Sequence, residues 1–278
     1  MISPASKRRS VLLIGCGNMG SAIALALQHT AENLDLTVID PDEARARQIL
    51  GSQNDIKVVN DSAALGSAQF EACILAVKPT SALETLVNTQ QNLQSSLVIS
   101  IAAGVPLAKL QQGVTDRARV ARVMPNLAAL VRKSITVGYA KDGIATEDRL
   151  LVEALFGAIG RFHWLKSEDE IDLATAVTGS GPGYVFSFVQ HLQQAAERVG
   201  FSKETADLFA RQIIVGAAGL VDEDPRSPLE LKHAVASPGG TTAAGLAVFE
   251  QAEAMPRILN KTVAAAAVRA KELATEQS

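Results

Sequence analysis

This chain of 278 residues has few cysteines and no net positive charge. The 2 cysteines, Cys16 and Cys73, are too few for a disulfide scaffold and have no metal-ligand spacing. We therefore expect reduced thiols in a cytoplasmic protein, and no metal site. A formal net charge of -3 gives no electrostatic reason to expect nucleic acid or an anionic membrane as a partner.

Aromatic residues and long apolar runs are also rare. Aromatic side chains make up 4% of the chain, so a core must be built mainly from Ala, Val, Leu and Ile. Because no run reaches about 18 apolar residues, no transmembrane helix is expected. Hydrophobic residues still account for 47% and charged residues for 20%, which allows a sizeable core in one large domain or two modest ones.

The first part of the chain alternates between short apolar runs and helical stretches. This alternation is typical of βαβ units around a mostly parallel sheet. We expect strands at residues 10–14, 34–40, 56–59, 72–77, 97–101, 119–123 and 135–139.

The pattern changes near residue 167, where strand signals largely end. Ala-rich stretches at 184–199, 205–221, 242–253 and 257–275 are expected to be helices. The sequence therefore predicts an α/β Rossmann domain over residues 1–168, followed by an all-α domain over 169–278. Ala-rich faces let helices approach closely, which suits an intertwined dimer, but a self-contained helical domain remains an alternative.

A glycine pattern lies between the first expected strand and the first expected helix. Gly15, Gly17 and Gly20 form G-x-G-x-x-G. In a dinucleotide site the first glycine permits a tight turn, the second lets the backbone approach a pyrophosphate, and the third lets helix and strand pack closely. The predicted cofactor-binding residues of this loop are Gly15, Cys16, Gly17, Asn18, Met19 and Gly20.

Asp40 follows Gly20 by 20 residues and ends the second expected strand. An acid at this spacing accepts hydrogen bonds from a ribose 2′-hydroxyl, and its charge repels a 2′-phosphate, which favours NAD. Arg45 and Arg47 could instead reach a phosphate, or lie on a solvated helix face. The sequence leaves NADH and NADPH both open.

Two further segments end expected strands with small residues. Ligands of open parallel sheets bind at the carboxyl ends of strands, so both segments are candidates for cofactor contact. Lys78 could bind ribose or phosphate, or be an ordinary exposed lysine. The candidates are Ala76, Val77, Lys78 and Pro79 in the first segment, and Ile101, Ala102 and Ala103 in the second.

Two segments rich in glycine and hydroxyl groups, residues 178–183 and 237–242, precede expected helices. A helix N-terminus with free N–H groups is a suitable site for a carboxylate. Ordinary helix capping is the alternative for each.

At these residues the chain resembles the pyrroline-5-carboxylate reductase family. The resemblance covers nearly the whole chain, with its motifs in order. They are GCGNMG at 15–20, AVKP at 76–79, SIAAGV at 100–105, RVMPN at 122–126, GSGPGYVF at 179–186 and SPGGTTAAGL at 237–246.

The resemblance implies reduction of a cyclic imine, 1-pyrroline-5-carboxylate, to proline with NADPH or NADH. It also implies a homodimer through interleaved C-terminal helices, with dimers often forming rings. It places Thr242 near the imine nitrogen, and we expect Ser180 to border the pocket, so both are the catalytic candidates. The expected substrate-binding residues are Ser237, Gly239, Gly240, Thr241 and Thr242.

The chain departs from the family pattern at three places. Leu127-Ala128 replace the usual Thr-Pro, Gly183 replaces Ala, and Gln190-His191 replace Glu-Ala. A rival interpretation, a 3-hydroxy-acid dehydrogenase, requires a lysine at the start of the helical domain, and residues 172–184 contain none. A non-catalytic NAD(P) sensor is a second rival, which the intact 237–242 loop disfavours.

Overall fold

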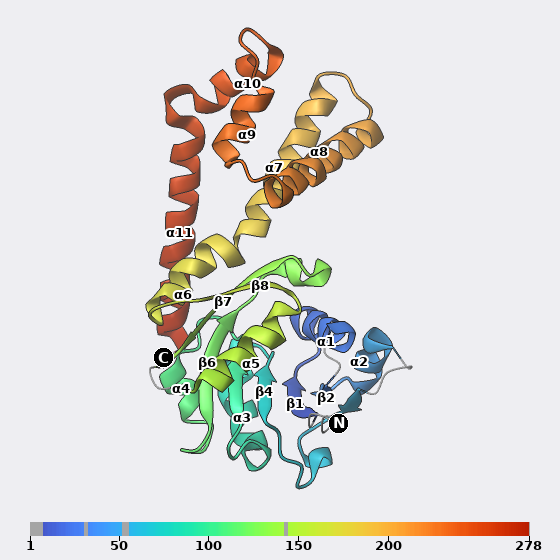
Figure 1. Cartoon of the computed structure of the whole chain (residues 1–278), viewed down its shortest axis with the longest axis vertical. Coiled ribbons are helices and arrows are strands. Elements are labelled where there is room, and N and C mark those ends of the chain that lie inside the picture. Colours follow the sequence, from blue (N-terminus) through green and yellow to red (C-terminus); the bar gives the residue numbers. More distant parts are fainter. Residues whose placement is uncertain (1–7, 31–32, 52–55, 142–143, 278) are drawn as a thin grey trace, which may run out of the picture. The chain divides into compact units, whose positions relative to one another are not determined.

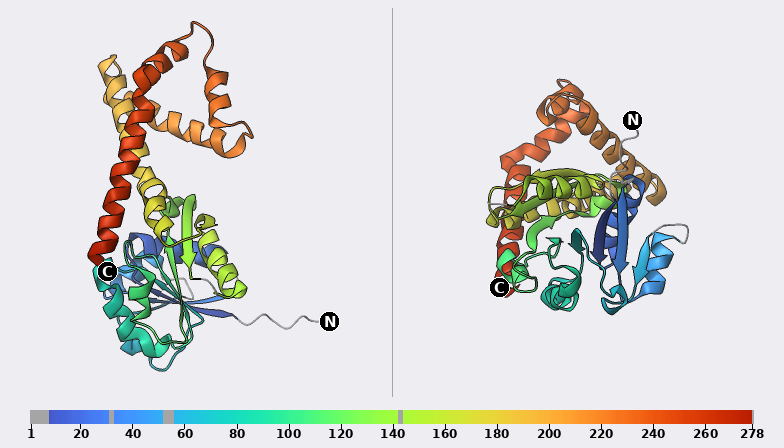
Figure 2. Two further views of the ribbon diagram at one scale, coloured as in Figure 1. Left: turned by 90° about the vertical axis from the view of Figure 1, so that its left-hand side faces the viewer. Right: turned by 60° about the horizontal axis from the view of Figure 1, so that its bottom comes forward.

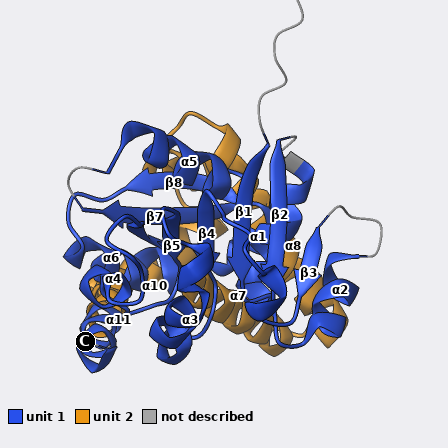
Figure 3. Cartoon of the chain, turned by 90° about the horizontal axis from the view of Figure 1, so that it is seen from below, with its two compact units in different colours: residues 1–180, 266–278 blue, residues 181–265 orange. Residues whose placement is uncertain are grey.

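The computed structural model describes residues 8–30, 33–51, 56–141 and 144–277. Most of its helices and strands are labelled in Figure 1. The chain divides into two compact units (Figure 3). Unit 1 comprises Met1–Ser180 with Ala266–Ser278, and unit 2 comprises Gly181–Ala265.

Unit 1 is built on an 8-stranded sheet with the order β3-β2-β1-β4-β5-β6-β7-β8. Strands β1 to β6 are parallel to one another, whereas β7 runs antiparallel to β6 and β8 is parallel to β7. The strands are β1 (Arg9–Ile14), β2 (Leu34–Ile39), β3 (Lys57–Val59), β4 (Ala72–Leu75), β5 (Leu97–Ser100), β6 (Arg119–Met124), β7 (Ser134–Ala140) and β8 (Gly160–Trp164). The first six follow the Rossmann order, so the predicted fold class of this part is confirmed.

Helices cover both faces of this sheet (Figure 2). One face packs against α1 (Asn18–Thr30), α2 (Glu43–Leu50) and α5 (Thr146–Gly157), with Ile23 and Leu27 fully or almost fully buried. The other face packs against α3 (Ala82–Thr89) and α4 (Leu107–Gln111). Short 3-10 helices complete the unit: η1 (Ala63–Leu65), η2 (Pro79–Ser81), η3 (Gln90–Asn92) and η4 (Leu127–Val131).

Unit 1 extends beyond residue 168, where the sequence placed the domain boundary. It includes α6 (Asp169–Ala174), the π-helix η5 (Thr175–Gly179) and the last turns of α11 (Ala254–Gln277). The Asn126 side chain donates to the Thr178 carbonyl at 2.9 Å, which ties η5 to the end of β6. The sequence signal changes where strands end, but packing against the sheet continues past that point.

Unit 2 is helical throughout, as predicted for this part of the chain. It contains α7 (Gly181–Arg198), α8 (Lys203–Glu223), α9 (Pro228–Val235), α10 (Thr241–Glu250), η6 (Gln251–Glu253) and the first turns of α11. Ser202 caps α8, and a capping box of Ser227 and Glu230 begins α9. In residues 181–265, all of which are described, only Ala206 and Ala210 are buried, so this unit has almost no core of its own.

Among the described residues, no helix has the length and apolar character needed to cross a membrane.

Candidate cofactor and substrate sites

The glycine loop lies at the carboxyl end of β1, where the strand order reverses between β1 and β4. Gly15 has φ +97, and a Cβ there would lie 2.5 Å from the Ala76 carbonyl oxygen. A Cβ on Gly20 would lie 1.9 Å from the Gly15 oxygen, so α1 can approach β1 only through glycine. Gly17, in contrast, has nothing within 4 Å of a Cβ. This open backbone at a helix N-terminus fits a pyrophosphate.

Asp40 lies beside the glycine loop, at the end of β2, and its side chain is 8% exposed. Its Oδ2 accepts from the Cys16 N–H at 2.7 Å, and its Oδ1 accepts from the Asp42 N–H at 3.0 Å. The Arg45 guanidinium lies 3.2 Å from both oxygens. Arg47 is held elsewhere, by Glu43 at 2.8 Å and the Val58 carbonyl at 2.7 Å. Of the two arginines, Arg45 is therefore the one that lies beside Asp40.

The ends of β4 and β5 continue the same edge of the sheet. The Ala76 N–H donates to the Ile14 carbonyl at 2.8 Å, and the Ile101 N–H donates to the Leu75 carbonyl at 3.1 Å. Lys78 is exposed, and Pro79 begins the 3-10 helix η2. The structure thus brings the expected cofactor-binding segments 15–20, 76–79 and 101–103 together with Asp40.

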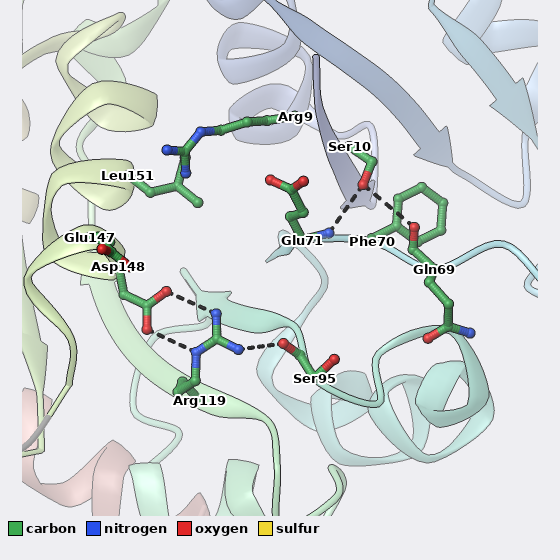
Figure 4. Close-up of a pocket in the computed structure, with 10 residues that line it drawn as sticks. All are labelled: Arg9, Ser10, Gln69, Phe70, Glu71, Ser95, Arg119, Glu147, Asp148 and Leu151. Atoms are coloured by element: carbon green, nitrogen blue, oxygen red, sulfur yellow. Dashed lines mark hydrogen bonds and ion pairs between the residues drawn. The ribbon is translucent and has the colours of Figure 1, made fainter. Parts of the chain in front are cut away.

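A hollow lies at the opposite end of the sheet from the glycine loop, at the amino ends of the strands (Figure 4). It has a volume of about 580 Å³, and its lining includes Arg9, Glu71, Arg119 and Asp148. The Arg119 Nε donates to Asp148 Oδ2 and a terminal nitrogen of Arg119 donates to Asp148 Oδ1, each at 2.8 Å. Arg119 also donates to the Ser95 carbonyl. None of the sequence-predicted site residues lines this hollow.

Ser180 does not lie at a free helix N-terminus, so the expected local structure of residues 178–183 is wrong. The π-helix η5 ends at Gly179, and α7 begins at Gly181. The Ser180 N–H donates to the Thr175 carbonyl at 2.9 Å and is therefore not free for a carboxylate. The helical path continues from η5 into α7 through these glycines, and π-turns of this kind are frequent at functional sites.

The 237–242 segment does form a turn before a helix, as predicted. Gly239 has φ +72, and the Gly240 N–H donates to the Ser237 carbonyl at 3.0 Å. Gly240 is the N-cap of α10, which begins at Thr241. The first N–H groups of an α-helix have no intrahelical acceptor, so those following Gly240 are available to an anion.

Known proteins resemble this chain over almost its full length. It is 33% identical over 274 residues to the pyrroline-5-carboxylate reductase of Pasteurella multocida, and the aligned region covers 95% of this chain and 98% of that protein. It is 33% identical over 273 residues to the pyrroline-5-carboxylate reductase of Pseudomonas aeruginosa, and the aligned region covers 96% of this chain and 97% of that protein. The chain belongs to the pyrroline-5-carboxylate reductase family.

Solved structures of the family share this fold. A pyrroline-5-carboxylate reductase from Coxiella burnetii matches with a TM-score of 0.88 and 31% identity, covering 96% of this chain and 99% of that chain. Pyrroline carboxylate reductase of Plasmodium falciparum, solved with NADP bound, matches with a TM-score of 0.80 and 27% identity. That match covers 97% of this chain and 100% of the Plasmodium chain.

Two family models match separate parts of the chain. Residues 168–273 match the family model described as pyrroline-5-carboxylate reductase dimerisation. Residues 10–104 match the family model described as NADP oxidoreductase, coenzyme F420-dependent. The family predicted from the sequence motifs is confirmed. As a pyrroline-5-carboxylate reductase family member, the chain is an oxidoreductase that uses NAD(P)H and forms homo-oligomers through its C-terminal region.

Sequence reasoning missed the roles of three polar residues near the cofactor side of the sheet. The ion pair of Arg45 with Asp40 was not predicted, because the sequence left Arg45 either to a phosphate or to a solvated helix face. Asn126, part of the RVMPN motif, was given no role, yet it caps η4 through Ala128 and holds η5 through Thr178. Glu168, which binds Arg122 at 2.7 Å, carries no local sequence signal because its partner is 46 residues away.

Proposed function

We propose that this chain catalyses the reduction of 1-pyrroline-5-carboxylate to L-proline with NADPH or NADH. The observation that carries the proposal is the likeness to pyrroline-5-carboxylate reductases over almost the full chain, together with two family models whose matched residues include 15–20 and 237–242. We further propose that residues 1–168 supply the cofactor-binding domain and residues 169–278 the substrate-binding and dimerisation domain.

In this proposal the cofactor pyrophosphate binds at the glycine loop, residues 15–20. Asp40 and Arg45 face the adenosine ribose, while Ala76–Pro79 and Ile101–Ala103 contact the rest of the cofactor. The open backbone at Gly17 supports this placement. When bound, the cofactor supplies the hydride.

The substrate loop consists of Ser237, Gly239, Gly240, Thr241 and Thr242. Its N–H groups at the start of α10 receive the substrate carboxylate, aided by the partial positive charge of the helix N-terminus. Ser180 borders the pocket.

The chemistry needs orientation more than acid–base machinery. A proton from water adds to the imine nitrogen, hydride adds to the carbon of the C=N bond, and the π electron pair of that bond moves to nitrogen, which leaves a secondary amine with one N–H. We assign to the Thr242 hydroxyl a hydrogen bond to that nitrogen, which orients the imine and favours its protonated form.

The proposal also covers assembly and location. We propose a homodimer through the C-terminal helices, further assembly of dimers into a ring, and a cytoplasmic location. Two buried, unpaired cysteines fit a reducing compartment.

The deciding experiment follows NAD(P)H absorbance with purified protein and racemic 1-pyrroline-5-carboxylate, using each reduced cofactor in turn. We expect substrate-dependent loss of absorbance with stoichiometric proline. Cofactor binding without such turnover would contradict the assignment and favour a non-catalytic NAD(P) sensor.

Thr242→Val tests the proposed hydroxyl, because valine keeps the side-chain shape and removes the hydrogen bond. We expect kcat to fall about tenfold to a hundredfold, because a hydrogen bond to a charged group contributes about 1.5–3 kcal/mol. Thr242→Ser keeps the hydroxyl and should retain most activity. Wild-type turnover by the valine variant would remove Thr242 from the mechanism.

A further inference from the structure

The loop between β5 and α4, residues 101–106, follows the expected cofactor-contact segment directly. In the strand order β2-β1-β4-β5, Asp40 at β2 marks the adenosine ribose, and the glycine loop at β1 marks the pyrophosphate. The β5–α4 loop lies on the opposite side of β1 from Asp40. It is therefore on the side of the nicotinamide half, given the cofactor placement under the proposed function.

Glu168 holds the far end of this loop. Its Oε1 accepts from the Leu107 N–H at 2.7 Å and from a terminal nitrogen of Arg122, also at 2.7 Å. The Arg122 side chain is 5% exposed, and its other carboxylate partner, Asp172, lies at 3.6 Å. The Glu168 Oε1 thus links the first N–H of α4, that of Leu107, to the buried guanidinium of Arg122 on β6. Charge-assisted hydrogen bonds of this kind are short and strong, so they hold the loop end in a defined position.

The last turns of α11 hold the middle of the loop. Gly104 has φ +72, and a Cβ there would lie 3.2 Å from the Leu273 carbonyl group and 3.3 Å from the Ala274 nitrogen. The helix backbone therefore packs directly on Gly104. The Lys109 ammonium donates to the Gln277 carbonyl, which anchors the end of α11 to α4. A cavity of about 430 Å³ lies among Pro106, Arg122, Glu168, Lys271 and Thr275.

We propose that Glu168 and the last turns of α11 are positioning groups that hold the β5–α4 loop in its cofactor-binding conformation. Glu168 and Leu273 stand at the two ends of the segment 168–273, which matches the dimerisation model. The segment that serves dimerisation thereby also sets the affinity for NAD(P)H. Neither group touches the reacting atoms, so their loss acts on cofactor binding and leaves the chemical step intact.

The test is a fluorescence titration of the full-length protein with NADPH, combined with KM and kcat for each substrate. For Glu168→Ala we expect the Kd and KM for NADPH to rise about tenfold, while kcat at saturation stays within about twofold. Glu168→Gln keeps an acceptor for Leu107 and should recover most of the affinity. Asp169→Ala removes the neighbouring exposed carboxylate and leaves the hydrogen bonds of Glu168 to Leu107 and Arg122 in place, so it serves as the matched control.

Lys109→Met gives a second variant that leaves the Arg122 ion pair intact, and we expect its Kd for NADPH to rise about threefold. An unchanged Kd in both Glu168→Ala and Lys109→Met would overturn the proposal, as would a fall in kcat with an unchanged KM for NADPH. Wild-type turnover of 1-pyrroline-5-carboxylate is measured in parallel. If wild-type turnover fails, the proposed function fails, while the NADPH titrations still decide the role of the loop.

Discussion

Asp40 already accepts hydrogen bonds from two backbone N–H groups and from Arg45, which changes how this acid would meet a cofactor bound at the proposed site. The neighbouring guanidinium, whose side chain is 44% exposed, offsets the carboxylate charge. An incoming 2′-phosphate would therefore meet a cation that can turn towards it, rather than an unpaired anion. Asp40 alone favours NADH, but the pair is compatible with NADPH.

Arg45→Gln tests this balance. We expect kcat/KM for NADPH to fall about tenfold, because a charge-assisted contact is lost, and kcat/KM for NADH to change little. Arg47→Gln is the control, since Arg47 is held by Glu43 and Val58. Equal losses with both cofactors would show that Arg45 only supports the loop.

Asp172 carries a pH dependence of stability. Burial raises the pKa of its carboxyl, and Arg122 offsets this shift only in part. Because the folded state then holds the proton more tightly than the unfolded chain, this group lowers stability as pH rises from about 3.9 through the raised folded pKa.

Asp172→Asn removes that titration while Glu168 still pairs with Arg122. We expect the variant to have a higher free energy of unfolding than wild type at pH 7, with the difference shrinking towards pH 4. Denaturant melts across this range measure it. A variant less stable than wild type at pH 7 would show that the ion pair with Arg122 outweighs the cost of burial.

The element α5 is fixed to β6 by a two-point ion pair between Arg119 and Asp148 (Figure 4). The Asp148 side chain is 10% exposed, so its loss leaves a half-buried guanidinium with the Ser95 carbonyl alone. We expect Asp148→Ala to lower the free energy of unfolding by about 1–3 kcal/mol. Glu147→Ala removes an adjacent exposed acid in the same helical turn, and a loss of similar size there would assign the effect to the helix dipole instead.

Elements with a strong local pattern were predictable from the sequence, and those defined by distant contacts were not. The seven expected strands are present because their apolar runs are buried. Strand β8 was missed because its residues alternate between half-buried and exposed, with Arg161 and His163 facing out. The π-helix before Ser180 and the extension of unit 1 past residue 168 depend on contacts such as Asn126 with Thr178, which no local pattern reports. In the candidate site, the spacing of the glycines predicted the glycine loop, whereas nothing in the sequence predicted that Arg45 would pair with Asp40.

At the scale of the whole molecule, unit 2 cannot be stabilised by its own interior. Large apolar side chains are exposed along its helices, among them Phe186 at 58%, Leu208 at 61% and Ile213 at 55%. Exposed apolar surface of this extent marks an interaction face. The match of residues 168–273 to a dimerisation family identifies the partner as a second copy of the chain. Folding of unit 2 and association are therefore expected to be coupled.

Ile213→Glu places a charge on this apolar surface of α8 and tests that coupling. Burying an unpaired carboxylate between subunits is costly, so we expect the variant to shift towards monomer in light scattering at micromolar concentration. It should also lose helical signal, because the exposed helices have no other core to join. Gln212→Glu adds the same charge one residue away on the same helix and should remain oligomeric, since a helical step of 100° turns it to another face. If Ile213→Glu retains both the wild-type assembly and its thermal midpoint, α8 contributes nothing to the interface at that position, and the subunit contact must be carried by the other exposed helices.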